Sequence, residues 1–223
     1  MHARGQVCHV DVDAEAWAAL PGRSPTAPEE SLVHRLAGLL PPDIRVHHAA
    51  ATPPGFDARF SALARRYAYR ICDDPARSDP LRRDVLLHRR ALDAAAMDAA
   101  AAPLVGEHDF AAFCKPRDGA TTIRRVLSLR CTRDHDGLVV VDNQADAFCH
   151  HMVRAVVGAL VAVGEGRRET SWPGDLLAAR ERDSAVTVLP PGGLTLESVT
   201  YPPDDELAAR AAVTMQVRTA TSA

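Results

Sequence analysis

The longest apolar helix of this chain is predicted by residues 148–163, which read FCHHMVRAVVGALVAV. From Met152 onward, apolar residues recur three and four positions apart over a wide stripe, a pattern typical of a helix buried on most sides. Two predicted strands precede this helix, and a shorter helix and a last strand follow it. This order lacks strict strand–helix–strand alternation, so it favours an α+β fold over a parallel doubly wound sheet.

The strands around this helix are indicated by alternation and by turn residues. Asp134-His135-Asp136-Gly137 is typical of a hairpin turn between two strands. The elements predicted for the second half are strands at 123–133, 138–145 and 194–199, and a short helix at 173–182.

The first half mixes the same kinds of element. Tyr67, Tyr69 and Ile71 alternate with Ala68 and Arg70, which predicts a strand. Thr26 and Glu29 predict a capping box for a helix, whose buried side would carry Leu32, Val33, Leu36, Leu39 and Leu40. We further expect a strand over residues 5–12 with Cys8, Val10 and Val12 on one face. The remaining elements expected in this part of the chain are an extended segment at 44–48, a connector or extended pair over 73–90, and an Ala-rich helix starting at Asp93.

Composition and charge bound the function. The 223 residues include 40 Ala, 25 Arg and the single lysine Lys115, and the net charge is −3. This charge excludes a uniformly basic nucleic-acid coat but not a local basic groove. The longest apolar run, at 155–164, is too short to span a bilayer, and no apolar leader opens the chain. We therefore expect a cytosolic protein with no membrane segment.

The cysteines predict neither a metal site nor a disulfide framework. The chain has five scattered cysteines and no C-x-x-C pair. We interpret them as small thiols, buried or half-buried, in a reducing compartment. His150 and His151 are neighbours on a predicted helix and point about 100° apart, so they would make a poor chelate. We expect no metal.

Two segments could form a basic groove for nucleic acid. Residues 56–90 carry a net charge of +4, and residues 115–133 carry +5. Within the first segment, Tyr67 and Tyr69 lie among arginines, which suits base stacking beside a phosphate track. The same tyrosines fit a buried strand face, and the arginines fit solvated strand faces, so both interpretations stay open.

Arg154 needs a partner. It lies within the most apolar helix of the chain, and an unpaired buried charge is costly. We expect a carboxylate opposite it. The cluster at 106–110, with His108 and Asp109, is typical of a helix-capping turn; a hydrolase that uses His108 and Asp109 is a further hypothesis, although no nucleophile and base accompany them.

Taken together, these segments resemble the tRNA pseudouridine synthase A family. The matching stretches run in consistent order from residue 2 to about 202. They are HARGQV at 2–7, which resembles the end of the family motif G-R-T-D-A-G-V-H-A-x-G-Q-V; ARFSA at 58–62 with RYAY at 66–69; GEHDF at 106–110 with Phe113; TIR at 122–124; FCHHMVR at 148–154 with Val157 and Gly158; and Pro191, Gly193, Leu194, Tyr201 and Pro202.

The resemblance implies an isomerase that converts uridine to pseudouridine in tRNA, in the anticodon stem-loop at positions 38–40, without a metal or cofactor. It implies that Tyr67 stacks on the target base and helps to remove the C5 proton, and that Arg59 contacts the flipped nucleotide. Arg154 would pair with the catalytic aspartate, with support from Phe148 and His151. The residues expected along the tRNA backbone are Arg65, Arg66, Lys115, Arg124 and Arg125.

The family also implies two halves of similar topology that share one mainly antiparallel sheet, in a homodimer. We divide the chain into an N-terminal half at 1–90, a C-terminal half at 91–203 and a tail at 204–223. The catalytic aspartate of the family belongs to the segment G-R-T-D-A-G, which this chain lacks. Asp11 and Asp13 follow the Gln-Val pair and do not replace it.

We therefore expect that the gene begins upstream of Met1 and that the first strand of the sheet is missing. The 223-residue chain would then contain no catalytic residue and would be inactive. We also expect it to be poorly stable, because the sheet lacks its first strand. The alternative is a non-catalytic tRNA-binding paralogue.

Overall fold

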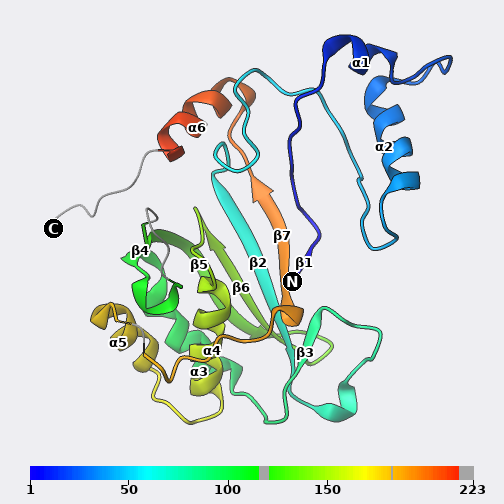
Figure 1. Cartoon of the computed structure of the whole chain (residues 1–223). Helices are drawn as coiled ribbons and strands as arrows, with labels where there is room; N and C mark the ends of the chain where they lie inside the picture. Colours follow the sequence, from blue (N-terminus) through cyan, green and yellow to red (C-terminus); the bar gives the residue numbers. More distant parts are fainter. Residues whose placement is uncertain (116–120, 182, 216–223) are drawn as a thin grey trace.

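One seven-stranded sheet forms the centre of the structure, a computed structural model that describes residues 1–115, 121–181 and 183–215. The strands follow the order β1-β7-β2-β6-β5-β4, and β3 pairs with the end of β2 (Figure 1). Four of the six pairings are antiparallel, and β1–β7 and β2–β3 are parallel. The predicted α+β fold with a mainly antiparallel sheet is confirmed. The strands are β1 (His2–Ala3), β2 (Ala64–Cys72), β3 (Val85–Leu87), β4 (Gly106–Asp109), β5 (Ile123–Arg133), β6 (Val139–Ala145) and β7 (Leu194–Thr200).

Strand β2 holds the middle of the sheet because it pairs on both sides. Tyr67 lies directly opposite Asn143 of β6 and Leu196 of β7. Side chains alternate between the two faces of a strand, so Tyr67 and the fully buried Tyr69 share one face. Arg66 lies on the other face.

Three helices cover the face that carries the tyrosines (Figure 1). They are α3 (Ala94–Ala101), α4 (Met152–Gly164) and α5 (Trp172–Ala179). The predicted start of the Ala-rich helix at Asp93 is confirmed: Asp93 is the N-cap of α3, and its carboxylate accepts from the backbone N–H of Ala95 and of Ala96, both at 2.9 Å. Within α4, every residue except Arg154 is buried, as the apolar stripe predicted.

Helix α4 begins four residues later than the sequence predicted. The residue before it, His151, has a left-handed backbone with φ 71°. A right-handed helix cannot pass through such a residue, so Phe148 and Cys149 belong to a turn rather than to the helix. Short 3-10 helices complete the chain at η1 (Pro75–Arg77), η2 (Ala102–Leu104), η3 (Ala111–Phe113), η4 (Pro191–Gly193) and η5 (Asp204–Glu206).

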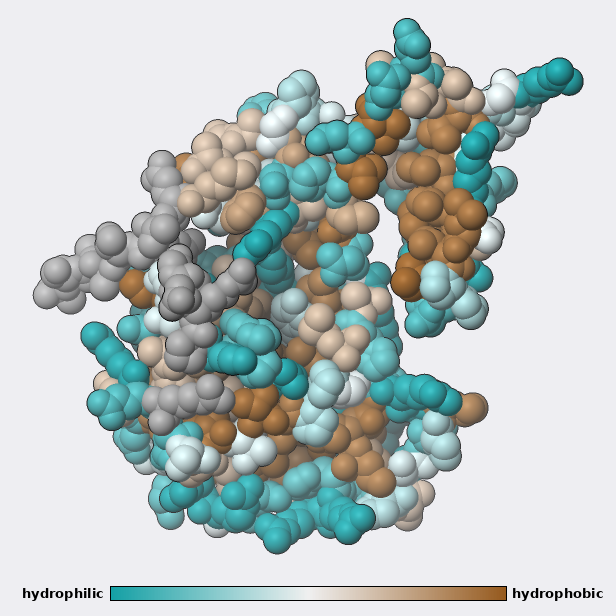
Figure 2. Space-filling view, viewed as in Figure 1, coloured by the Kyte–Doolittle hydropathy of each residue, from teal (hydrophilic) through white to brown (hydrophobic). Residues whose placement is uncertain are grey.

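Helices α1 (Ala14–Ala19) and α2 (Pro28–Leu39) lie away from the sheet (Figure 1). The predicted burial of α2 is wrong, because Ser31 is its one buried residue and Leu39 is 79% exposed. Apolar side chains run openly along α2 at the upper right of Figure 2. The capping box is wrong as well: the N-cap is Ala27, and the Thr26 hydroxyl lies 2.8 Å from that of Ser31.

Three more stretches carried sequence predictions, and two of them differ from the expectation. Residues 6–13 form no strand, and the sheet pairing of β1 covers His2 and Ala3 only. An alternating pattern marks one apolar face but supplies no neighbouring strand, and Val10 is 72% exposed. Residues 44–48 take no regular structure, and residues 106–109 form β4 rather than a capping turn.

The tail begins as a helix. Helix α6 (Leu207–Met215) contacts the segment before β2, where the Ser61 hydroxyl donates to the Leu207 carbonyl at 3.0 Å. Residues 116–120 of the basic segment 115–133, residue 182 of the predicted helix 173–182, and residues 216–223 of the tail lie outside the described residues. The division into halves at 1–90 and 91–203 stays a prediction. None of the helices that the structure describes combines the length and apolarity needed to cross a membrane.

Candidate active site and nucleic-acid interface

Tyr67 and Phe148 meet above the middle of the sheet. Their ring centroids are 5.1 Å apart and the ring planes are perpendicular, an edge-to-face arrangement favoured by the ring quadrupoles. Both side chains are half-buried and pack against the core. Burial raises the pKa of Tyr67 and outweighs the opposite effect of the Arg65 charge. The phenol is therefore neutral at pH 7.

Arg154 lies in the first turn of α4 and is half-buried. Its Nη1 donates to the Leu189 carbonyl at 3.1 Å, and the Leu189 N–H donates back to the Arg154 carbonyl at 3.3 Å. No carboxylate of the described residues forms an ion pair with Arg154, so the expected carboxylate partner stays a prediction. A carbonyl leaves most of the five guanidinium donors for another acceptor.

Tyr69 connects Arg154 with β2. Its hydroxyl donates to the Pro190 carbonyl at 2.7 Å, one residue from the carbonyl that Arg154 contacts. Burial raises the pKa of Tyr69, and the charge of Arg154 acts against that rise. The start of α4 and the middle of β2 are thus neighbours. Of the two interpretations left open for this tyrosine, the structure favours the core aromatic.

His150 and His151 occupy the turn before α4. Their ring centroids are 4.0 Å apart, and the His151 carbonyl accepts the N–H of Ala155 at 3.0 Å as the first bond of the helix. Among the described residues, no cluster of three or more His, Cys, Asp and Glu could hold a metal ion.

Arg65 ties two loops together. Its Nη1 donates to the Asp146 carbonyl at 2.9 Å, and its Nη2 donates to the Arg59 carbonyl. Burial lowers the pKa of the Arg65 guanidinium, and the neighbouring tyrosines act against that change. Arg65 therefore holds the loop that carries Arg59 next to the end of β6.

Arg59 itself is exposed at a turn built by Asp57. The Asp57 carboxylate accepts the N–H of Arg59 at 2.7 Å and of Phe60 at 2.8 Å. Burial raises the pKa of Asp57, but these backbone bonds outweigh it and the net shift is downward. The Arg59 guanidinium lies 5.0 Å from the centroid of the Phe60 ring.

Arg66 points to the opposite face of the sheet from Tyr67. Its guanidinium forms a two-pronged contact with Asp142 on β6, with nitrogen–oxygen distances of 2.6 to 3.0 Å. The hydrogen bonds to Asp142 raise the pKa of Arg66. A tRNA track through Arg66 would have to cross the sheet edge to meet Tyr67, so the structure does not bring these two residues together.

The remaining basic residues border β5 and the turn before α4. Lys115 is exposed, and its backbone N–H donates to the His150 carbonyl at 2.9 Å. Arg124 is half-buried and its Nη1 donates to the Ile123 carbonyl at 2.5 Å. Arg125 is exposed and lies 3.7 Å from Glu107 of β4.

The hydrolase hypothesis finds no support in β4. His108 Nε2 lies 3.1 Å from the Val105 carbonyl. Asp109 accepts from the Thr122 hydroxyl at 2.5 Å and from the Ala111 N–H at 3.1 Å. Both side chains therefore complete local structure and do not act as a pair.

The prediction of five free thiols is wrong. Cys114 and Cys149 form a disulfide, while Cys8, Cys72 and Cys131 are free. The pairing joins residues 35 positions apart, which no local spacing pattern reveals. It places the end of η3 against the turn that carries Phe148.

Asn143 is a buried polar residue that the sequence patterns did not single out. It is 1% exposed, faces the core beside Tyr67, and neither amide atom has a hydrogen-bond partner among the described residues. The signal was present, because Val139, Val141 and Ala145 set a core-facing alternation that Asn143 interrupts with a polar side chain.

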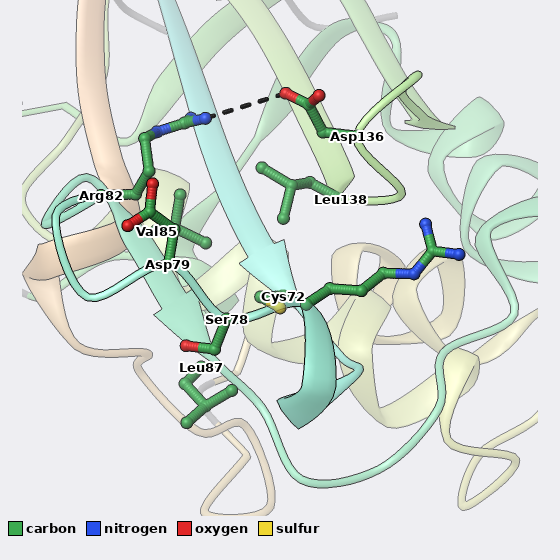
Figure 3. Close-up of a pocket in the computed structure, with 9 residues that line it drawn as sticks. Cys72, Ser78, Asp79, Arg82, Val85, Leu87, Asp136 and Leu138 are labelled. Atoms are coloured by element: carbon green, nitrogen blue, oxygen red, sulfur yellow. Dashed lines mark ion pairs between the residues drawn. The ribbon is translucent and has the colours of Figure 1, made fainter.

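A cavity of about 310 Å³ lies at the C-terminal end of β2 and is lined by Cys72, Arg82 and Asp136 among others (Figure 3). Arg82 and Asp136 are 3.9 Å apart. Five residues of strand, about 16 Å, separate Cys72 from Tyr67. Because acidic and basic side chains both line this cavity, it lacks the positive charge that a nucleic-acid site needs.

Comparison with known proteins shows which class of protein this chain resembles. A family model described as tRNA pseudouridine synthase matches residues 100–202. The tRNA pseudouridine synthase A of Streptomyces griseus is 56% identical over 221 residues, which cover 98% of this chain and 75% of that protein. The protein of the same name from Frankia casuarinae is 56% identical over 219 residues, with 98% and 76% covered, and that of Mycobacterium leprae is 46% identical over 222 residues, with 98% and 77% covered.

At this similarity the chain belongs to the tRNA pseudouridine synthase A family, a family of isomerases. The resemblance drawn from the sequence motifs is confirmed.

Proposed function

We propose that this chain carries the tRNA-binding and base-binding parts of an enzyme that converts uridine to pseudouridine in the anticodon stem-loop of tRNA, at positions 38–40. The observation that carries the proposal is the grouping of Tyr67, Phe148 and the Arg154 end of α4 on one face of the sheet. This grouping offers a stacking platform beside an arginine with unused donors. The family and the names of the relatives support tRNA as the substrate.

The reaction moves one bond of the nucleotide. An aspartate starts it, the bond between ribose C1′ and uracil N1 breaks, the base turns, and C1′ bonds to C5. The C5 proton then leaves and N1 gains a proton. Because the base cannot be reached inside a stack, it must be flipped out into the protein.

Tyr67 would hold the flipped uracil by stacking, and Phe148 packs against the Tyr67 ring with the two ring planes perpendicular. Its raised pKa keeps the hydroxyl protonated at pH 7, so stacking is its main role and any part in removing the C5 proton is secondary. Arg59 would bind the phosphate of the flipped nucleotide. Lys115, Arg124 and Arg125 would follow the backbone beyond it.

Arg154 would orient the aspartate through donors that Leu189 leaves unused. The 223 residues contain no G-R-T-D-A-G segment, and no described carboxylate pairs with Arg154. We therefore propose that the 223-residue chain binds tRNA without isomerising it. The assay is tritium release from tRNA that carries [5-³H]uridine, because the C5 hydrogen is lost in the reaction; release above background by the 223-residue chain would disprove this proposal.

A non-catalytic tRNA-binding paralogue is the second candidate, and the same missing segment motivates it. The synthase and the non-catalytic paralogue predict different DNA sequences upstream of the Met1 codon. An in-frame G-R-T-D-A-G sequence, and tritium release by the chain expressed with it, would favour the synthase. An in-frame stop codon would favour the paralogue.

The stacking role is tested by tRNA binding. We expect Tyr67→Leu to weaken binding by roughly 5- to 150-fold, since stacking is worth about 1–3 kcal/mol per base, while Tyr67→Phe keeps the ring and stays near wild type. Tyr69→Phe is the control: it loses the bond to Pro190 and some stability, with unchanged affinity. Wild-type affinity in Tyr67→Leu would refute the assignment.

We further propose a cytoplasmic homodimer, as the family resemblance implies. Sedimentation equilibrium of the chain should give twice the mass of one copy. A mass of one copy over the micromolar range would contradict the dimer.

A further inference from the structure

The disulfide between Cys114 and Cys149 joins two segments that both border the candidate site. Their Cα atoms are 5.7 Å apart, within the range that a disulfide spans. We propose that this bond is a reversible redox link that sets the affinity of the protein for tRNA. The inference rests on the proposed tRNA binding and deepens it.

The link fixes Lys115 to the turn before α4. Cys149 lies between Phe148, which packs against Tyr67, and His150, whose carbonyl accepts the Lys115 N–H at 2.9 Å. The covalent bond and this hydrogen bond lie side by side in the chain. Together they hold one cation of the proposed tRNA track in register with the stacking platform.

The two cysteine residues differ in exposure. Cys114 is 1% exposed, whereas Cys149 is half-buried. An external thiolate therefore attacks the Cys149 sulfur, the disulfide breaks, and Cys114 leaves as a thiolate that takes up a proton. A second thiolate then attacks the mixed disulfide and releases the Cys149 thiol. In sum, two low-molecular-weight thiols become one disulfide while the protein gains two thiols, and the reverse exchange with that disulfide re-forms the link.

The free cysteines do not compete for this role within one chain. Cys72 and Cys131 are buried, and burial raises the pKa of Cys131 to about 12, so its sulfur stays a thiol. Cys8 is exposed and is the other candidate for reaction with an external oxidant. It therefore serves as the control.

Reduction frees the Lys115 segment from the turn. Binding must then order both segments, and this ordering weakens affinity. We expect the reduced chain to bind tRNA roughly three- to tenfold more weakly than the oxidised chain.

The experiment compares the oxidised chain with the chain treated with dithiothreitol. Iodoacetamide labelling of the chain unfolded in denaturant should count three free thiols before reduction and five after it, with Cys114 and Cys149 as the new ones. Hydrogen exchange should show faster exchange of the Lys115 amide in the reduced chain. Titration with tRNA under both conditions gives the ratio of the two affinities.

Two variants separate this link from other thiol effects. Cys149→Ser and, should that variant unfold, Cys114→Ala should bind tRNA like the reduced chain under both conditions. Cys8→Ser should keep the full difference between oxidised and reduced protein.

The outcomes are distinct. Equal Lys115 exchange or equal tRNA affinity in the two forms overturns the redox link and leaves the proposed function standing. A difference that disappears in Cys8→Ser overturns it too, because the effect then belongs to Cys8. If neither form binds tRNA, the proposed function fails and this inference fails with it.

Discussion

Gly158 lies in the middle of α4, where the helix meets residues 187–189. A Cβ atom added there would lie 1.8 Å from the carbonyl oxygen of Thr187 and 3.7 Å from Cγ of Leu189. The first contact is far inside van der Waals distance, and it involves backbone. Because a backbone carbonyl cannot rotate away as a side chain can, Gly158→Ala must push the 187–189 segment off the helix.

The expected loss of stability follows from two opposing effects. Alanine is favoured over glycine in a helix interior by about 1 kcal/mol. Overpacking of a close-packed site costs roughly 1–3 kcal/mol, and a clash with backbone belongs at the upper end. We therefore expect the free energy of unfolding to fall by about 1–2 kcal/mol, which lowers Tm by roughly 2–8 °C for a chain of this size.

Urea denaturation followed by circular dichroism measures this change. Gly38 in α2 offers a matched control, because a Cβ atom there would meet nothing within 4 Å. Gly38→Ala should raise stability by up to about 1 kcal/mol through helix propensity alone. The reasoning is refuted if Gly158→Ala is as stable as the wild type, or if the two variants change stability in the same direction.

Two further predictions concern buried polar groups. Asn143→Leu should raise the free energy of unfolding by about 1–3 kcal/mol, since the buried amide atoms have no partner among the described residues; a loss of stability would show that the amide is satisfied in solution. Asp73→Asn should lower it by about 1–3 kcal/mol at pH 7, because hydrogen bonds from Arg133 hold the pKa of the buried Asp73 below its usual value. That stabilisation is present above pH 4 and is lost as pH falls through the lowered pKa, so the difference between variant and wild type should shrink in urea titrations at pH 3; a constant difference would contradict it.

The second half of the chain could be predicted well because local pattern and tertiary packing agree there. The strand at 139–145 alternates strictly, the strand at 123–133 alternates on either side of a register shift between Val126 and Ser128, and Gly137 supplies the positive φ of their turn. The apolar stripe of α4 has its expected partner in the sheet. Arg154 was recognised because it is the one charged residue in that stripe.

The first half could be predicted less well because the patterns there lack partners. The apolar stripe of α2 is amphipathic, yet Leu39 of that helix is exposed in the described structure. Val10, on the apolar face of the strand predicted at 5–12, is exposed as well. Amphipathic spacing predicts which face of a helix is apolar, but it does not predict which element packs against that face. The start of α4 was missed for another reason: the left-handed backbone of His151 is a property of the folded turn and not of the residue type.

Contacts between residues far apart in the chain were the hardest to predict from the sequence. The Cys114–Cys149 bond spans 35 residues, and the contact between Arg66 and Asp142 spans 76. Charge counts suggested a basic track that included Arg65 and Arg66. Arg65 instead binds two carbonyls and Arg66 faces the other side of the sheet, which only strand register could reveal.

The position of β2 also affects synthesis of the chain. Its neighbours β6 and β7 lie later in the sequence, and β7 ends about 130 residues after β2 does. At a translation rate of about 5–20 residues per second, both hydrogen-bonding edges of β2 around Tyr67 stay open on the ribosome until β6 emerges, since β3 pairs only with residues 70–72. The edge that later pairs with β7 stays open for roughly 6 to 26 seconds. The proposed base-binding platform is therefore among the last parts of the protein to form, and during that interval the nascent strand is a target for chaperones and for pairing with the wrong chain.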